Sequence, residues 1–569
     1  MRYASVMQLK KGYEKEYQRR HDDLWPELKL HLTECGIHNY YIYLLEETGQ
    51  LFATFEADKL NKRKLVHNPL MQRWWRYMAD IMETKESSWE PLASPLRTVF
   101  TFGVKVEKKQ IVLVLDIGKT NIKLCLIDLL SGECVRSYRT ANQPNSGGRY
   151  PHSDTAAIWR WIRSTVREVC RDYSVRHICI TTHGATIACL AGGELALPIL
   201  DYEYTGIEEF NDCYHAVRPN FLETFSPRLP AGLNLGKQLF WLQKKYPKTF
   251  QNVDTLLTYP QYWVYRFTGV SVSEVTSLGC HTDLWNPVSN SFSTLTQKQG
   301  WDKIFPPLFP SGGAISTVKD DLARDLGLPE SCLVHNGIHD SNASLVPYIN
   351  LYEGPKTIIS SGTWTIIATI NGQLKYMDES KDMLANVDVK GQVTPTIRFM
   401  GGREWAALKG NSPARLSDVL HILESSIFAL PSFSEQGGPF ACYKGQLVNG
   451  KKLISESQKS ALADLYLALI SNYCLEKIQA ADDIFVAGVL SSNPFYLEHL
   501  ASLRPHSQLF KSTDRTGTAL GAAMLSTSLP SPEITKERVP INNTLRPLLH
   551  KYQAEWRQQV RDHCCVGRD

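Results

Sequence analysis

The 569-residue sequence contains no Cys-x-x-Cys pair, no apolar run long enough to cross a membrane and no marked excess of either charge. Its 13 cysteines are scattered apart from Cys564-Cys565, so we expect reduced cytoplasmic thiols and no zinc site. With 62 basic and 58 acidic residues the net charge is only +4, which gives no indication of a nucleic-acid or membrane surface. Met1-Arg-Tyr-Ala-Ser leads into mixed polar sequence, so no signal peptide is predicted. We therefore expect a cytoplasmic protein with small-molecule ligands.

The length suffices for two to four domains, and one motif indicates phosphate chemistry. An apolar run at 112–115 leads into Asp116-Ile-Gly118-Lys-Thr120-Asn121, which predicts a buried strand, a glycine turn and a returning strand. Gly118 would let backbone N–H groups approach a phosphate, Asp116 would face its magnesium ion, and Thr120 and Asn121 would add donors. The motif resembles the first phosphate loop of the sugar kinase, actin and Hsp70 superfamily. The alternative is an ordinary hairpin with a polar turn.

The first hundred residues predict a separate unit, residues 1–104, joined to the rest by a polar linker at 103–110. Period-two and helical spacings give the order β-α-β-β-α-β, which is that of a ferredoxin-like α+β sandwich. The expected strands are 4–9, 39–45, 51–57 and 97–102, and the expected helices are 13–34 and 68–83.

Aromatic and polar residues recur within this unit. Tyr17 and His21 are four residues apart and share a helix face. Aromatic rings can pack on the C–H faces of a sugar, and a histidine with a near-neutral pKa can move the protons that open a pyranose ring. The alternative is that Trp74 and Trp75 are core residues and that His21 lies on the surface.

These blocks, together with Trp25-Pro-Glu-Leu, closely resemble the L-rhamnose mutarotase family over residues 1–102. The resemblance implies that His21 is the proton donor. It also implies that four aromatic residues line the sugar pocket: Tyr17, Tyr40, Trp74 and Trp75. Some members act on L-fucose, so it narrows the substrate to 6-deoxy-L-hexoses. Because its members are dimers, it further implies a homodimer.

The remaining sequence alternates strands and helices and carries further glycine motifs, at 334–343, 358–364, 484–493 and 516–524. In this order they resemble the FGGY family of carbohydrate kinases over about 110–530. That family has two actin-like (ribonuclease H-like) domains, here 110–352 for sugar and phosphate and 353–530 for nucleotide. The resemblance implies ATP and Mg2+ as cofactors, with Asp116 at the metal. It implies that Asp340 is the catalytic base and that Gly362 and Thr363 form the second phosphate loop. It also implies that four residues surround the adenosine: Gly401, Gly402, Gly488 and Asn493.

One residue departs from the family pattern, because Val489 follows Gly488 where a second glycine is usual. Asp340 has an alternative role as a helix cap. His183 and Asp201 fall where the family contacts the ketose, and the alternatives are a satisfied core histidine and a loop aspartate. Residues 531–569 are expected to form an appended polar helix, a C-terminal extension with no assigned chemistry.

Together these features predict a bifunctional enzyme that interconverts L-rhamnose anomers and phosphorylates L-rhamnulose with Mg-ATP. The alternatives are an L-fucose mutarotase with an L-fuculose kinase, another ketose kinase, or a non-catalytic sugar-sensing actin-like protein. The presence of both Asp116 and Asp340 favours an enzyme over the sensor.

Overall fold

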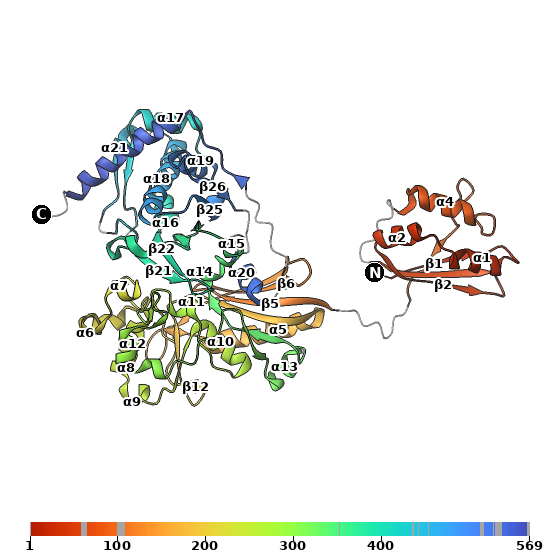
Figure 1. The fold of residues 1–569 in the computed structure, drawn as a ribbon, viewed down its shortest axis with the longest axis horizontal. Helices are drawn as coiled ribbons and strands as arrows, with labels where there is room; N and C mark the ends of the chain where they lie inside the picture. Colours follow the sequence, from red (N-terminus) through yellow and green to blue (C-terminus); the bar gives the residue numbers. More distant parts are fainter. Residues whose placement is uncertain are drawn as a thin grey trace. The chain divides into compact units, whose positions relative to one another are not determined.

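The computed structural model describes residues 2–57, 65–99, 108–351, 353–434, 437–441, 443–452, 455–512, 517–526, 529 and 537–565. The chain divides into two compact units, residues 1–107 and 108–569 (Figure 1). Each unit has a hydrophobic core of its own. Among the described residues, none of the helices combines the length and the apolar character needed to span a membrane.

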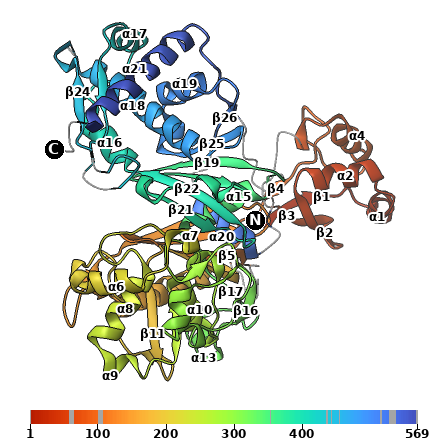
Figure 2. The same ribbon diagram turned by 60° about the vertical axis from the view of Figure 1, so that its left-hand side comes forward.

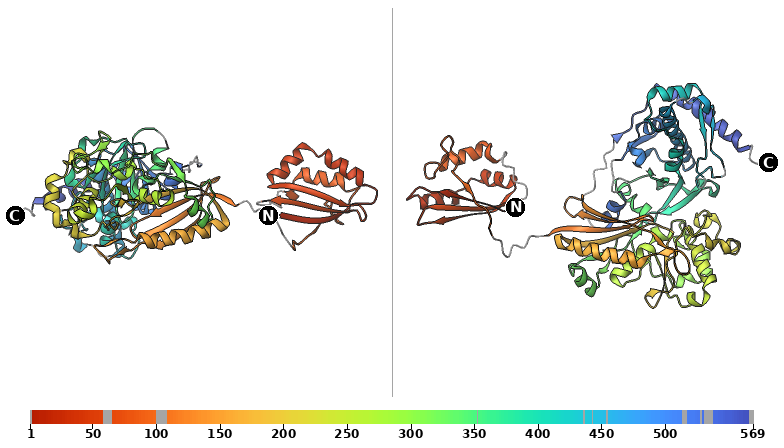
Figure 3. Two further views of the ribbon diagram at one scale, coloured as in Figure 1. Left: turned by 90° about the horizontal axis from the view of Figure 1, so that it is seen from below. Right: turned by 180° about the vertical axis from the view of Figure 1, so that it is seen from behind.

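The first unit is a four-stranded antiparallel sheet with helices on one face (Figure 3). Its strand order, β2-β3-β1-β4, is the one expected of a ferredoxin-like sandwich. The strands are β1 Arg2–Gln8, β2 Ile37–Leu45, β3 Gln50–Ala57 and β4 Ser94–Pro95, and the helices are α1 Glu14–Asp22, α2 Pro26–Glu34 and α4 Pro69–Met78.

Two elements of this unit differ from the sequence-based expectation. The single helix expected over 13–34 is broken, because Pro26 starts a new helix and Trp25 before it is extended, with φ −56° and ψ 133°. The strand expected at 97–102 is replaced by the short β4 at Ser94–Pro95, and residues 100–102 lie outside the described residues. The linker at 103–107 also lies outside them, and β5 begins at Lys109.

The second unit is built on two separate sheets, and the main strands of each sheet are arranged in the same pattern. In the first, a meander of β5, β6 and β7 is extended by the parallel strand β10, with β17 beyond it. In the second, β19, β20 and β22 form the meander, and β25 and β26 extend it in parallel. The strands are β5 Lys109–Ile117, β6 Asn121–Asp128, β7 Cys134–Ala141, β10 Tyr173–Thr182, β17 Leu333–His335, β19 Lys356–Ser361, β20 Thr365–Ile370, β22 Val393–Phe399, β25 Asp483–Gly488 and β26 Gln508–Lys511.

We call residues 108–351, which include the first sheet, the N-terminal lobe, and residues 353–565, which include the second sheet, the C-terminal lobe. Shorter strands extend the sheets at their edges, and the repeated pattern confirms the actin-like architecture. Helix α20 follows β26 in the chain but contacts β5 and β10 of the N-terminal lobe. The edge strands and β18 are β16 Ala314–Thr317, β18 Ile338–His339, β21 Met383–Val387 and β27 Glu537–Arg538, and the main helices against the sheets are α5 Thr155–Asp172, α13 Asp320–Leu326, α14 Asp340–Ala343 and α20 Gly517–Ser526.

A largely helical insertion between β10 and β17 forms the yellow and green part of the N-terminal lobe in Figure 2. It has its own aromatic core, which includes Trp241, Trp285 and Trp301. Its principal elements are β11 Ile187–Ala191, β13 Thr255–Thr258, α6 Asn211–Val217, α7 Phe221–Thr224, α8 Leu235–Lys245, α10 Tyr259–Thr268, α11 Val275–Leu278 and α12 Thr294–Lys298.

The C-terminal lobe is completed by helices, of which the last falls in the region expected to be an extension. This helix, α21 Arg546–Cys565, buries Leu549, Tyr552, Trp556 and Val560 in the core of the lobe. Their spacing of three or four residues places them on one face. The helix is therefore amphipathic and packs into the lobe. The other helices are α16 Gly401–Leu408, α17 Leu416–Glu424, α18 Glu456–Lys477 and α19 Pro494–Leu503.

Candidate active sites

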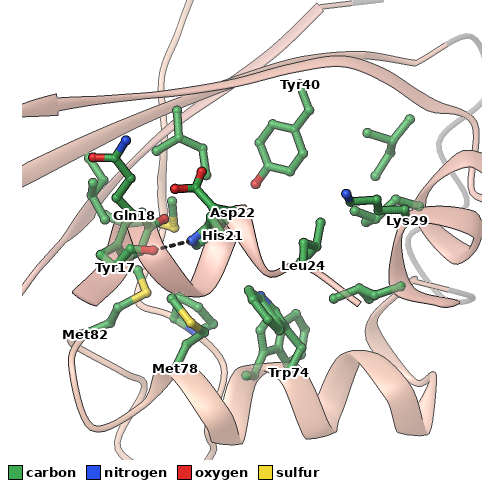
Figure 4. A pocket seen from close by; sticks show the side chains of 18 of the residues that line it. Tyr17, Gln18, His21, Asp22, Leu24, Lys29, Tyr40, Trp74, Met78 and Met82 are labelled. Atoms are coloured by element: carbon green, nitrogen blue, oxygen red, sulfur yellow. Dashed lines mark hydrogen bonds between the residues drawn. The ribbon is translucent and has the colours of Figure 1, made fainter. Parts of the chain in front are cut away.

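A pocket of about 740 Å3 opens between the helices and the sheet of the first unit (Figure 4). All five residues assigned to sugar chemistry line it: Tyr17, His21, Tyr40, Trp74 and Trp75. They come from α1, β2 and α4, which the chain separates by as many as 58 positions. The fold therefore brings these five residues into one cavity. In the sequence they were related only by their residue types and by the family resemblance.

His21 lines this pocket, and one of its ring nitrogens is held by the backbone. Its Nδ1 lies 3.0 Å from the Tyr17 carbonyl oxygen, which can only accept, so Nδ1 carries the proton and Nε2 keeps its lone pair. The Tyr17 ring lies 4.3 Å away and the Trp74 ring 5.4 Å, edge-on. Burial lowers the pKa of His21, and the Tyr17 carbonyl and Asp22 oppose that shift. The lowered pKa favours the neutral imidazole at physiological pH.

The tryptophans serve both the core and the pocket. Trp74 and Trp75 are only 6% and 8% exposed, as a core interpretation requires, yet both face the cavity. Asn68 fixes the start of α4 by accepting a hydrogen bond from Leu70 N at 2.8 Å, which sets the face that the helix presents. Tyr40 keeps 44% of its surface exposed but points its hydroxyl into the pocket (Figure 4).

Gln18 and Asp22 also line the pocket and were missed by the sequence analysis. They follow Tyr17 and His21 by one position, so they share the adjacent stripe of α1. Figure 4 shows both side chains beside His21. The signal available was their i, i+4 spacing, which repeats that of Tyr17 and His21.

In the second unit, the two aspartates assigned to phosphoryl transfer lie near the carboxyl ends of β5 and β18, two strands that pair with β10. Strand β10 pairs with β5, where Thr181 is opposite Asp116, and with β18, where Thr182 is opposite His339, the residue before Asp340. Asp116 is 8% exposed, and Lys123 Nζ lies 3.7 Å from its carboxylate. Burial raises the pKa of Asp116 to about 6; Lys123 opposes this shift and the charge of Asp340 reinforces it.

Asp340 is the first residue of α14. Its Oδ1 lies 3.3 Å from His339 Nε2 and accepts a hydrogen bond from Ser341 Oγ at 3.3 Å. Its side chain is 31% exposed, and it lines a small cavity of about 180 Å3 between α14 and the C-terminal sheet. Burial raises the pKa of Asp340, while the nearby His183 opposes that shift.

The first glycine turn has the expected form. It joins β5 to β6, with Gly118 N donating to Asn121 O at 2.9 Å. Asn142 Nδ2 holds the Gly118 carbonyl at 2.7 Å, and Asn121 Nδ2 donates to Thr120 Oγ1 at 2.9 Å. Thr120 is exposed at the tip of the turn.

The glycines assigned to the nucleotide converge in the C-terminal lobe. Gly362 and Thr363 form the turn between β19 and β20, at the position that Gly118 occupies between β5 and β6. Gly402 N donates to Thr363 O at 3.2 Å, so the start of α16 packs directly on this turn. A Cβ at Gly402 would meet the Gly362 carbonyl and would lie 3.2 Å from Thr363 Cα. Gly401 is buried beside it, against Thr365.

The backbone at Gly488-Val489 does not require the second glycine of the family pattern. Gly488 has φ +76°, and a Cβ there would collide with the Ser361 carbonyl, so only glycine fits. Val489 begins a short 3-10 helix and is 72% exposed, so no close contact demands a second glycine. Asn493 caps α19 by accepting from Tyr496 N at 3.0 Å and donates to Asp464 at 2.7 Å. Its role at the adenosine stays a prediction.

His183 and Asp201 line one small pocket, together with Lys119 and Tyr202. Lys119 forms an ion pair with Asp201 and lies over the Tyr202 ring at 4.7 Å. His183 lies between Tyr202 and Tyr259, with ring centroids 5.5 and 5.2 Å away. Lys119 was missed as a site residue, although it stands inside the glycine motif. The two sugar candidates are thus adjacent, and their contact with a sugar stays a prediction.

Comparisons with known proteins agree with this division. Residues 2–102 match the family model for L-rhamnose mutarotase, residues 111–347 that for the FGGY family of carbohydrate kinases, N-terminal domain, and residues 353–535 that for the carbohydrate kinase FGGY, C-terminal domain. A solved carbohydrate kinase from Novosphingobium aromaticivorans is 32% identical, covers 80% of this chain and 99% of its own, and superposes with a TM-score of 0.74. The chain belongs to the FGGY family of carbohydrate kinases, with an L-rhamnose mutarotase unit at its N-terminus.

The mutarotase unit matches nearly the full length of its relatives. The L-rhamnose mutarotase of Sinorhizobium fredii is 49% identical over 100 residues, which are 17% of this chain and 95% of the relative. That of Flavobacterium johnsoniae is 44% identical over 101 residues, 18% of this chain and 94% of the relative. A xylulose kinase from Lactobacillus acidophilus, 15% identical with a TM-score of 0.67 over 80% of this chain and 99% of its own, shares the kinase fold. The protein is thus a sugar kinase fused to a mutarotase.

Proposed function

We propose that the mutarotase unit interconverts the anomers of L-rhamnose and that the kinase phosphorylates L-rhamnulose with Mg-ATP. The observation that carries the sugar assignment is the pocket that His21 lines together with Tyr17, Trp74 and Tyr40, while the Tyr17 carbonyl holds His21 Nδ1. Relatives at 49% and 44% identity are L-rhamnose mutarotases, which supports this sugar for the first unit. L-Rhamnulose, the ketose that corresponds to L-rhamnose, is then the proposed substrate of the kinase.

His21 moves the proton that ring opening requires. Neutral Nε2 accepts the proton of the anomeric hydroxyl while the bond between the anomeric carbon and the ring oxygen breaks and the carbonyl forms. The imidazolium then gives that proton to the ring oxygen, so no charge is left on the open sugar. Rotation about the bond to the carbonyl carbon and the reverse steps give the other anomer. The hydrogen bond from Nδ1 to Tyr17 O fixes the tautomer throughout.

Asp340 accepts the proton of the attacking sugar hydroxyl in the kinase. His339 and Ser341 hold its carboxylate by contacts of 3.3 Å each. Asp116 would hold the magnesium ion of Mg-ATP, and the site fits a cation because the charge of Asp340 acts on Asp116 and adds to the effect of burial, which raises the pKa of Asp116 to about 6. The bound nucleotide supplies the transferred phosphoryl group. The turns at Gly118 and Gly362 offer backbone N–H groups to phosphate oxygens.

Coupled ADP release from the full-length protein, measured across L-rhamnulose, L-fuculose, L-xylulose and L-ribulose, tests the kinase assignment. We expect the highest kcat/KM with L-rhamnulose. A higher value with L-fuculose would replace the assignment by an L-fuculose kinase, and no turnover with any ketose would favour the sugar-sensing alternative. We further propose that the protein is cytoplasmic and forms a homodimer. Light scattering on the full-length protein tests whether it is a dimer. Exposed Tyr41, Tyr43 and Leu45 on the edge strand β2 support a contact there.

A further inference from the structure

A separate cleft of about 590 Å3 lies in the C-terminal lobe, between the end of α18, the helix α21 and the segment 437–441. Figure 1 shows α18 and α21 together in the upper lobe. The cleft shares no lining residue with the mutarotase pocket or with the cavities at His183 and Asp340. Its volume is that of an ordinary small-molecule site.

The walls of the cleft are aromatic. Phe440 is the central ring, and it contacts Tyr443, Tyr473 and Trp556 at centroid distances of 5.4, 4.8 and 6.5 Å. The Phe440 and Trp556 rings are buried, while Tyr443 and Tyr473, which also line the cleft, are half-buried. Such rings offer their electron-rich faces to the C–H groups of a sugar.

The rim of the cleft is basic. Four cationic side chains line it, and Glu476 is its one acidic side chain among the described residues. Arg557 Nη2 pairs with Glu476 at 2.5 Å, but its buried Nε has no hydrogen-bond partner among the described residues. A buried donor without a partner is unfavourable, so a rotation of the Arg557 side chain that brings Nε to a ligand oxygen would be favoured. The four cations are Lys381, Lys477, Arg557 and Arg561.

We propose that this cleft is a second, non-catalytic site that binds a phosphorylated sugar. The aromatic wall takes the C–H face of the sugar, and the arginine and lysine side chains take the phosphate, for which guanidinium is the preferred partner. Inorganic phosphate would leave the aromatic wall unused, and an uncharged sugar would leave the cations unpaired. Both should therefore bind weakly.

The cleft is connected by short contacts to the second phosphate turn. Lys381 precedes Asp382, whose Oδ2 accepts from Gly438 N at 2.9 Å and from Arg398 Nε at 3.2 Å. Arg398 lies over the Trp364 ring at 4.8 Å, and Trp364 follows Thr363 in the turn. Because Lys381 and Phe440 belong to the cleft, a ligand there constrains both sides of the Asp382 contact. We expect a bound sugar phosphate to change the KM for ATP at least threefold.

Calorimetry on the full-length protein tests the site, with fructose 1-phosphate as the probe. We expect saturable binding that is at least tenfold tighter than that of inorganic phosphate or fructose. The variant K477E/R561E changes two exposed cations of the rim and should lose at least tenfold in affinity while keeping its basal kinase activity. The matched control, K459E/K551E, reverses two lysines on the same helices outside the cleft and should bind as the wild type does.

Two outcomes would overturn the proposed binding site, and a third would overturn its connection to the phosphate turn. Equal binding by K477E/R561E would place the sugar phosphate elsewhere, including the kinase active site. Tighter binding of AMP than of fructose 1-phosphate, lost in the same variant, would make the cleft a nucleotide site. Binding without any change in the KM for ATP would remove the connection to the phosphate turn. None of these results depends on which ketose the kinase phosphorylates.

Discussion

Asp340 lies where a carboxylate can accept a proton, and its position argues against the helix-cap alternative. The N-cap of α14 is His339, whose side chain makes no capping hydrogen bond, and Asp340 is already the first helical residue. Its side chain is 31% exposed, so a substrate hydroxyl can reach it. Burial raises the pKa of Asp340, which makes the carboxylate a better proton acceptor than a surface aspartate.

Asp340→Asn should therefore lower kcat by about 10²–10⁴-fold, because the amide cannot accept the proton. Thermal stability and ATP binding should stay near those of the wild type, as measured by calorimetry. Asp325→Asn, in α13 of the same lobe, removes an equal charge at the surface and serves as the control. Retention of more than about a tenth of kcat, a barrier change of only ~1.4 kcal/mol, would exclude Asp340 as the base.

His21 predicts the pH dependence of mutarotation. Burial lowers its pKa from the ordinary 6.5, so the neutral, proton-accepting form persists below that pH. The exchange rate, followed by saturation-transfer NMR on L-rhamnose, should be flat at neutral pH and fall only below 6.5. Because the pKa of His21 is higher in the unfolded state than in the folded state, the unfolded state takes up the proton at a higher pH. The stability of the unit should therefore fall as the pH drops through this range.

His21→Ala should abolish this exchange without unfolding the unit, whereas His67→Ala, at an exposed position of the same unit, should leave it unchanged. An acidic limb centred above pH 6.5 would contradict the burial argument. If the wild-type unit leaves the exchange of both L-rhamnose and L-fucose at the buffer rate, the mutarotase proposal is wrong.

At the scale of elements, each lobe contains a hairpin with a glycine turn after its first strand, β5-β6 in the N-terminal lobe and β19-β20 in the C-terminal lobe. The turn after β19 is constrained from behind by Gly402, where a Cβ would lie 3.2 Å from Thr363 Cα. Its outer side is open, because the first atom that a Cβ at Gly362 would meet among the described residues is Trp364 O at 3.9 Å. One glycine is thus required by the fold, and the other is free to serve a ligand.

Two alanine substitutions separate these requirements. Gly402→Ala overpacks α16 against backbone that cannot move aside, at a cost of about 1–3 kcal/mol, and should lower the Tm of the kinase and raise the KM for ATP. Gly362→Ala should keep the wild-type Tm but raise the KM for ATP at least tenfold, because the methyl group occupies the space that a phosphate needs. A wild-type KM in Gly362→Ala would show that no phosphate approaches this turn.

The sequence predicted strand-and-turn elements well because their signals are local. The turns at Gly118 and Gly362 and the five sugar-pocket residues follow from short motifs and from family resemblance, and the structure brings the five pocket residues together in one cavity. The ion pair of Lys119 with Asp201 spans 82 positions and has no local signal. The burial of α21 was missed for a related reason, since its apolar face is visible only once the partner surface of the lobe exists. The break at Pro26 had a signal, the proline itself.

At the scale of the whole molecule, two compact units with separate cores carry two chemistries that do not share an intermediate. The mutarotase acts on an aldose, and the proposed kinase substrate is a ketose. The mutarotase and kinase families account for residues 2–102, 111–347 and 353–535, and neither chemistry converts an aldose into a ketose. A separate aldose-ketose isomerase must therefore act between them, and direct transfer of a sugar from the first unit to the second has no chemical basis.

The fusion should accordingly give no kinetic advantage. With purified isomerase added, the full-length protein and an equimolar mixture of its units 1–107 and 108–569 should convert L-rhamnose to ketose phosphate at the same flux. Each unit has its own hydrophobic core, so both should fold when separated, which circular dichroism checks first. The comparison must be made at matched kinase activity and oligomeric state, because a dimer contact through the first unit would also be lost on separation. A several-fold higher flux for the fused protein would contradict this prediction and would indicate that the full chain recruits the isomerase.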